Sequence, residues 1–401
     1  MNEQRHIPWE WLVIAAAGVM IVTMGARQSL GLFLAPIDQS TGLGIATISF
    51  AMAIAQFVWG AVQPVAGAIA DRYGPGRVLV GGLVLLSLGT ALTPLLDTGL
   101  GLIFTIGLMQ AAGTGAASFS VLVGATMRRL PVYSRGMASG IINAGGSFGQ
   151  FLFAPILQRL IAGLGWPVAM WCMAVAALAI TPAARLLRRP PQPATTALVG
   201  GGLGASVRSA MGNRSYLLLH AGFFTCGFHI AFLVTHLPGE INLCGLPAGV
   251  ASWSLAIIGL ANIVGSLLAG WGVGRYRSKY ILAGMYASRT LLILLYLAAP
   301  KTAATFYIFA AGLGLTWLAT VPPTAGIVGK LFGPQYLSTL FGLTLLSHQI
   351  GGFLGAWLGG LAMTYLGNYD IMWYADAALA AAAAVINLPI REPMVAREAT
   401  A

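Results

Sequence analysis

Charge is scarce in this 401-residue chain, because Asp, Glu, Lys and Arg together make up only 8% of it. A soluble domain carries roughly 25% charged residues. The three cysteines, Cys172, Cys226 and Cys244, show no metal or redox spacing, and we find no nucleophile or metal set at the predicted membrane surface. These absences argue against an enzyme, so we expect no catalytic residues, no metal and no cofactor.

Apolar residues, by contrast, make up 58% of the chain. Apolar stretches of around 20 residues recur along its length, each able to cross a hydrocarbon layer of ~30 Å as a helix. The first is too long for a cleavable signal peptide. We predict an all-α integral membrane protein with twelve transmembrane helices, at about 10–36, 45–70, 78–96, 100–126, 136–162, 166–186, 215–237, 248–272, 280–299, 303–328, 337–365 and 370–390.

The second half of the chain repeats the first at an offset of 202 or 203 positions. This repeat pairs Arg27 with His229. Two similar halves in a membrane protein usually hold a binding site between them, near the bilayer midplane. We therefore expect an N-terminal six-helix bundle at 1–186, a mobile cytoplasmic linker rich in proline and glycine at 187–213, and a C-terminal six-helix bundle at 214–401.

The basic residues of the predicted loops gather on one side of the spans. Only Arg159 and Lys301 fall on the other side, which holds acidic residues instead. This is the positive-inside pattern, and it predicts that both termini are cytoplasmic. The net charge of +11 therefore orients the protein in a bacterial inner membrane and requires no nucleic-acid partner.

The loop after the second span reads G-A-I-A-D-R-Y-G-P-G-R-V. It resembles the signature loop of the major facilitator superfamily, and the resemblance extends over the whole chain in span count and repeat. The second copy keeps Arg275 but has Gly274 in place of the acid. We expect a cytoplasmic gate in which ion pairs latch helix ends, although a solvated turn is the alternative. Its residues would be Gly67, Asp71, Arg72, Gly74, Arg77 and Arg275.

Arg27 lies near the middle of the first span, where an arginine costs about 2.5–3.5 kcal/mol by insertion scales. Its planar fork of donors suits a carboxylate. The surrounding R-Q-S-L-G-L-F resembles the first span of monocarboxylate transporters and their bacterial oxalate–formate relatives, which implies a basic residue beside the substrate path. Gln28 is the other candidate for that position. Alternatively, Arg27 binds backbone carbonyls or an acid from another span.

Histidines occupy the predicted seventh and eleventh spans. His229 and His236 share one helical stripe with Thr225 and Phe232, and His348 precedes Gln349. Because histidine titrates near neutral pH, we predict His229, His236 and His348 as proton carriers. A neutral, hydrogen-bonded imidazole in the helix packing is the alternative for each.

Further polar side chains fall on spans expected to line the cavity, although each alone is also explained by a helix–helix hydrogen bond. The predicted substrate-binding set is Arg27, Gln28, Gln110, Asn143, His229, Trp317, His348 and Gln349. Arg289 lies midway along the ninth span and Asp376 inside the twelfth. We expect these two to form a structural ion pair.

The pattern as a whole predicts a secondary active transporter that acts as a monomer in the lipid bilayer. Its partners would be a small organic anion, most simply a monocarboxylate held between Arg27 and His229, and protons. The alternative is an exporter of drugs, siderophores or other neutral or zwitterionic molecules of the same superfamily.

Overall fold

The computed structural model describes residues 8–127, 129–130, 135–188, 203–273, 275–333 and 337–393. Every regular element among these residues is a helix. Ten of the spans are long and apolar enough to cross a membrane. With α17 (Leu337–Leu366) and α18 (Asp370–Asn387) the described chain has the twelve predicted spans. The all-α, twelve-span prediction is confirmed.

Six spans form the N-terminal half, and four of them, the first, third, fourth and sixth, are interrupted. The first changes to a 3-10 helix after Gln28, and the fourth contains a π-helical segment, η3, that ends at Gln110. In chain order the spans are α1 (Trp9–Gln28), η1 (Leu30–Phe33) and α2 (Leu34–Thr41); α3 (Ile45–Tyr73); α4 (Pro75–Leu92) and η2 (Thr93–Leu95); α5 (Gly99–Leu102), η3 (Ile103–Gln110), α6 (Ala111–Ala116) and α7 (Phe119–Met127); α8 (Arg135–Leu164); and α9 (Trp166–Ala179) with α10 (Thr181–Leu186).

The C-terminal half is less interrupted, since only its fourth span breaks, at Trp317. Residues 189–202 of the expected linker lie outside the described residues, but the linker also contains a helix, α11 (Leu203–Met211), that the sequence analysis did not predict. The spans are α12 (Arg214–Leu243); α13 (Ala248–Val273); α14 (Ser278–Ala298); α15 (Ala303–Thr316), η5 (Leu318–Thr320) and α16 (Val321–Phe332); α17; and α18.

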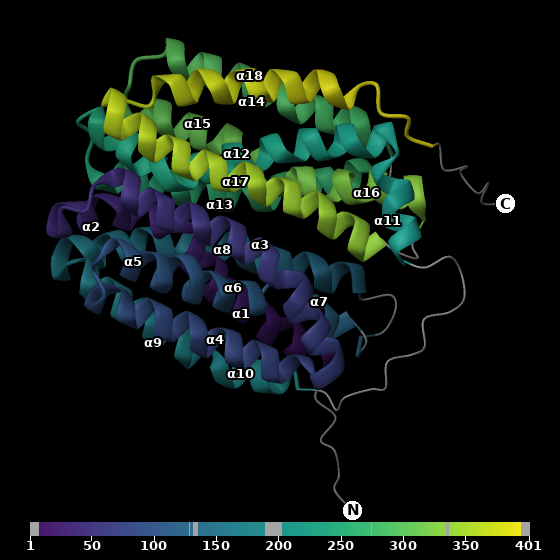
Figure 1. Cartoon of the computed structure of the whole chain (residues 1–401), viewed down its shortest axis with the longest axis horizontal. Helices are drawn as coiled ribbons and strands as arrows, with labels where there is room; N and C mark the ends of the chain where they lie inside the picture. The colour runs from purple at the N-terminus through teal and green to yellow at the C-terminus, as the bar shows by residue number, and fades with distance from the viewer. Residues whose placement is uncertain are drawn as a thin grey trace, which may run out of the picture.

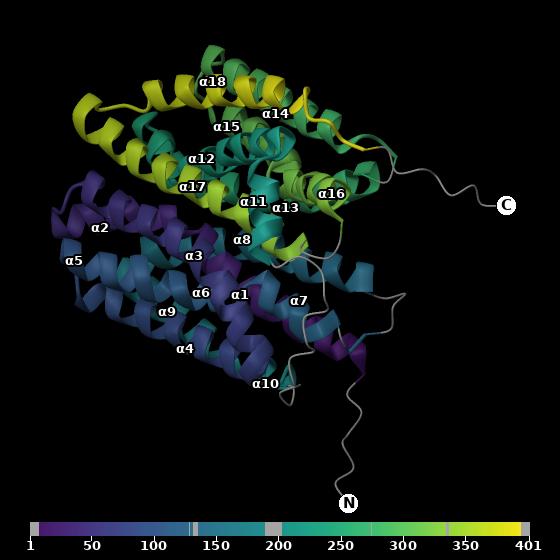
Figure 2. The same cartoon turned by 45° about the vertical axis from the view of Figure 1, so that its right-hand side comes forward.

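The two halves lie side by side as two layers of helices (Figure 1). The N-terminal half, drawn from purple to blue, meets the C-terminal half, drawn from teal to yellow, along two helix pairs, α3 with α17 and α8 with α13. The view turned by 45° keeps the same division (Figure 2). The surface between the halves is therefore built from α3 and α8 on one side and α13 and α17 on the other.

Repeated glycines bring matching helices together in both halves. A Cβ added to Gly149 of α8 would collide with the backbone carbonyl of Ile21 in α1. Its repeat mate Gly351 in α17 stands in the same relation to Phe224 of α12. Small residues allow such close backbone approach in membranes, where packing drives helix association. The sequence repeat is therefore also a repeat of packing.

The helix ends define a basic end of the molecule, with Arg72, Arg77 and Arg185, and an acidic end, with Asp97 and Asp370. Contacts between the halves run from mid-depth towards the acidic end, where the Phe50 ring of α3 lies against Trp357 of α17, with centroids 5.5 Å apart. Close by, a Cβ at Gly31 would collide with the Val234 carbonyl of α12. Near the basic end, α7 and α16 pack within their own halves. The halves are thus joined at the acidic end.

Candidate functional site

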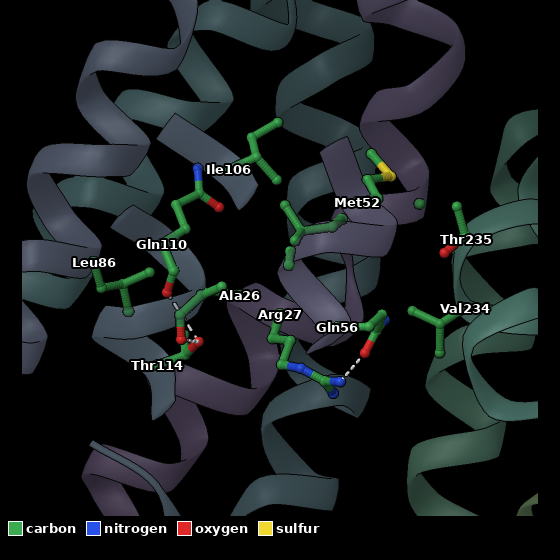
Figure 3. A pocket seen from close by; sticks show the side chains of 14 residues that line it. Ala26, Arg27, Met52, Gln56, Leu86, Ile106, Gln110, Thr114, Val234 and Thr235 are labelled. Carbon is green, nitrogen blue, oxygen red and sulfur yellow. Dashed lines mark hydrogen bonds between the residues drawn. The ribbon is translucent and has the colours of Figure 1, made fainter. Parts of the chain in front are cut away.

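A small cavity lies at mid-depth between the halves. The N-terminal half supplies most of its lining, including Arg27, Gln56 and Gln110, and α12 closes it with Val234 and Thr235. Most other lining residues are apolar. Figure 3 shows Arg27 and Gln56 pointing towards each other beside the α12 wall. The cavity thus spans both halves, as the sequence repeat predicts.

Among the described residues that line the cavity, Arg27 is the one cation. It lies in the last turn of α1, where the negative end of the helix dipole favours a positive charge. Its Nη2 donates to Oε1 of Gln56 and its Nη1 to Oε1 of Gln28 at 3.3 Å, while its Cζ lies 4.0 Å from the centroid of the Trp59 ring. These acceptors are neutral. Among the described residues no carboxylate lies within ion-pair distance of Arg27, so its charge is available to an anion.

Two predicted residues, Gln28 and Gln110, lie beside this cation. Gln28 is buried, and its Oε1 accepts the hydrogen bond from Arg27. Gln110 lines the cavity, and its Nε2 donates to the Thr93 hydroxyl at 3.1 Å. The predicted set omitted Gln56 and Trp59. Their spacing of three residues on α3 places both on one helix face, and this was the signal that could have found them.

His229 does not face the cavity, which corrects the predicted clamp between Arg27 and His229. Its side chain is fully buried, and its Nδ1 contacts Oδ2 of Asp376 on α18. The α-helix of the first span ends at Gln28, whereas α12 continues past His229 to Leu243, so the two repeat mates have different surroundings. The buried Asp376 carboxylate also needs a hydrogen-bond partner, and His229 provides it.

The expected ion pair between Arg289 and Asp376 is likewise absent from the described structure. Arg289 instead caps the break in the tenth span, where its Nη2 donates to the carbonyl oxygens of Thr316 and Trp317, the latter at 2.9 Å. Its Nη1 lies 3.5 Å from Cys226 Sγ. The reason is geometric: a broken helix leaves carbonyls without partners, and the guanidinium fork satisfies two of them at once.

Other predicted residues lie away from the cavity lining. Trp317 is fully buried at the helix break, and Asn143 is half-buried on α8. His236 is fixed between helices, because its Nε2 lies 2.7 Å from the Ala356 carbonyl. His348 and Gln349 contact each other at 3.3 Å between Nδ1 and Nε2. Of the predicted substrate-binding residues, therefore, only Gln28 and Gln110 lie with Arg27 at the cavity.

The predicted gate lies at the basic end. Gly74 separates α3 from α4 with φ 94°, a left-handed conformation that glycine adopts freely, and the next residue, Pro75, opens α4. Arg72 and Arg77 are exposed, while the side chain of Asp71 lies outside the described residues. In the second copy Arg275 stacks on Trp271, with its Cζ 4.0 Å from the ring centroid. The gating role stays a prediction.

This two-layered, twelve-span architecture with a mid-depth cavity is that of a membrane transporter. The sequence model of the Major Facilitator Superfamily matches residues 16–356, and the chain belongs to this superfamily. It is 26% identical over 392 residues to "Monocarboxylate transporter 13" of Rattus norvegicus, covering 95% of this chain and 89% of that protein. It is 24% identical over 366 residues to "Oxalate:formate antiporter" of Oxalobacter formigenes, covering 90% and 86%.

Among solved structures, a D-xylose–proton symporter matches with a TM-score of 0.75 at 14% identity, over 96% of this chain and 98% of that chain. At this identity the likeness concerns the fold alone. It agrees with the arrangement of the twelve helices described above, while the family model confirms the superfamily resemblance of the signature loop.

Proposed function

We propose that the protein moves a small organic anion, a monocarboxylate, across the bacterial inner membrane by alternating access, with protons as the coupled ion. The observation that carries this proposal is the uncompensated charge of Arg27 in an otherwise neutral cavity. A carboxylate accepts two parallel N–H bonds from a guanidinium. One cation matches one carboxylate, and the apolar lining suits a short hydrocarbon chain.

The relatives support the same class, because two of them are named for the transport of carboxylates. The residues of the cavity lining point to the same substrate class independently of these relatives. An exporter of organic cations would keep an acid in its cavity, and the described lining contains none.

The orientation follows from charge. We place the basic end in the cytoplasm, because basic residues near span ends are retained on that side. With this orientation, the contacts at the acidic end, such as Gly31 against Val234, would close the outer side, as expected for an inward-facing arrangement. An anion bound at Arg27 would also touch α12, and closure of the inner side would carry it across.

The test is a thermal-shift screen of the purified protein against lactate, pyruvate, acetate, formate, oxalate, succinate and a set of organic cations at two pH values. Binding to the folded state raises apparent stability by mass action, by about 2.7 kcal/mol at a ligand concentration of 100 Kd. We expect stabilisation by monocarboxylates, stronger at the lower pH, and its loss in Arg27→Gln.

Arg159→Gln is the matched control, because it removes an exposed arginine at the acidic end. Carboxylate binding that survives in Arg27→Gln would contradict the site. Stabilisation by neutral or cationic compounds alone would contradict the anion assignment and favour the exporter alternative.

A further inference from the structure

Buried polar groups of the C-terminal half remain unused by the anion site. His229 and Asp376 are both fully buried and contact each other through Nδ1 and Oδ2. The two remaining polar atoms, His229 Nε2 and Asp376 Oδ1, have no hydrogen-bond partner among the described residues. Two long helices, α12 and α18, thus bring an acid and a base together where no solvent reaches them.

Such a pair takes up a proton for an electrostatic reason. With a neutral imidazole and an ionised carboxylate it carries a net charge of −1 in a water-excluded interior, which is costly. One added proton makes the pair neutral overall, whether the proton lies on the imidazole or on the carboxyl group. Ionisable residues inside membrane spans often mark proton relays for this reason.

The surroundings of the pair decide how costly the unprotonated form is. Aromatic rings lie next to it along the chain, since Phe232 and Trp373, one turn from His229 and Asp376, pack on each other with their centroids 5.2 Å apart. Neither α13 nor η1, which also pack on α12, carries a titratable side chain. The titratable or charged side chains at this depth on the packed helices are Arg289, Tyr286 and Tyr296 of α14, His348 of α17, and Cys226 and His236 of α12.

A line of polar side chains leads from this pair towards the anion cavity. Cys226 lies one turn before His229 on α12 and has Arg289 and His348 as polar neighbours. His348 contacts Gln349 at 3.3 Å. Gln349 packs against Gly60 of α3, the residue after the Trp59 that lies under Arg27.

From this juxtaposition we infer that His229 and Asp376 form the proton-binding site of the transporter, and that Cys226, His348 and Gln349 connect it to the anion cavity. The inference rests on the proposed function and adds the location of the coupled ion. Loading takes one proton from water in the cavity and leaves the pair neutral; unloading returns that proton and leaves a charge of −1. One monocarboxylate at Arg27 and one proton at the pair make an electrically neutral load.

The test needs no substrate. The full-length protein, reconstituted in lipid and labelled with [¹³C]aspartate and [¹⁵N]histidine, is titrated from about pH 6 upward by infrared difference spectroscopy. This starting pH lies above the model-peptide pKa of aspartate, about 3.9. We expect a coupled aspartate–histidine signal in the wild type. We expect its loss in Asp376→Asn and in His229→Gln, and its retention in His236→Gln and Arg27→Gln.

A wild-type protein without a titrating aspartate or histidine band from this pair would overturn the inference, and this result requires no variant to fold. An unchanged titration in Asp376→Asn would also overturn it. Because Arg27→Gln should lose carboxylate binding but keep the proton signal, a failure of the anion site and a failure of the proton site are distinguishable.

In proteoliposomes, the variants that lose the proton signal, Asp376→Asn and His229→Gln, should still exchange a monocarboxylate across the membrane. The substrate is whichever of lactate, pyruvate, acetate or formate binds in the thermal-shift screen. They should no longer accumulate it along an imposed pH gradient. Undiminished accumulation by a folded Asp376→Asn variant would overturn the inference.

Discussion

Glu392 offers the sharpest test of how the C-terminal half is held together. It follows α18 and is almost fully buried, and its Oε1 accepts hydrogen bonds from Lys330 Nζ at 2.6 Å and from the Ser278 N–H at 3.0 Å. Its Oε2 accepts the Lys279 N–H at 3.0 Å. A carboxylate therefore caps the start of α14 and pairs with the end of α16. We predict that Glu392→Gln destabilises this half.

The magnitude follows from what glutamine retains. One amide oxygen can replace one carboxylate oxygen, so one backbone N–H bond survives and the other is lost. A hydrogen bond to a charged group contributes about 1.5–3 kcal/mol, and charge at a helix N-terminus adds about 0.3–1 kcal/mol. The ion pair adds little, because the Lys330 side chain is 20% exposed. We expect a loss of roughly 2 kcal/mol, or about 4–8 °C in Tm for a unit of this size.

The pH dependence gives an independent check. Burial by itself would raise the pKa of Glu392, but hydrogen bonds from Lys330, Lys279 and Ser278 outweigh burial and lower the pKa below its ordinary value of 4.5. The unfolded chain then binds the proton more tightly than the folded protein. The stabilisation is therefore complete above pH 4.5 and is lost as the pH falls through the lowered pKa.

Thermal unfolding of purified wild type and Glu392→Gln, at one scan rate and in one detergent, measures the effect. The two Tm values should differ at neutral pH and converge in acid. Glu10→Gln is the control, because Glu10 is exposed at the start of α1. Equal Tm values for Glu392→Gln and wild type at neutral pH would contradict this stabilising role of Glu392.

Three further predictions concern the cavity and the packing. Arg27→Gln should weaken monocarboxylate binding about 10- to 100-fold, because a hydrogen bond from a charged group is lost. Arg27→Lys keeps the charge and should weaken binding only about fivefold. Calorimetry measures both affinities. Asn262→Ala should lower stability by about 1–3 kcal/mol, because Asn262 Oδ1 accepts the Leu318 N–H at 2.8 Å at the helix break. Gly351→Ala should lower the free energy of denaturant unfolding by about 1–3 kcal/mol, because the added Cβ would meet a backbone carbonyl of α12. The control Gly352→Ala should be tolerated, because the nearest atom to its added Cβ lies 3.5 Å away.

The sequence predicts the spans well, because each helix in a bilayer must satisfy its own backbone and so needs its own apolar stretch. The position of Arg27 in the cavity also follows from sequence, since a cation at mid-span must reach water or a partner. The sequence does not predict which side chain each buried charged residue contacts. Asp376 contacts His229, which lies 147 positions away in the sequence. Charge alone favoured Arg289 as its partner, but Arg289 donates to the Trp317 carbonyl at the helix break instead.

The two halves repeat their packing but not their chemistry. Gly149 and Gly351 serve the same close approach in each half, yet the first span breaks at Ser29 while α12 continues through the matching depth to Leu243. The break turns the chain just after Arg27, so its side chain lines the cavity. The unbroken α12 keeps His229 on the flank that meets α18. A single interruption in one repeat thus separates the proposed anion site of the N-terminal half from the proposed proton site of the C-terminal half.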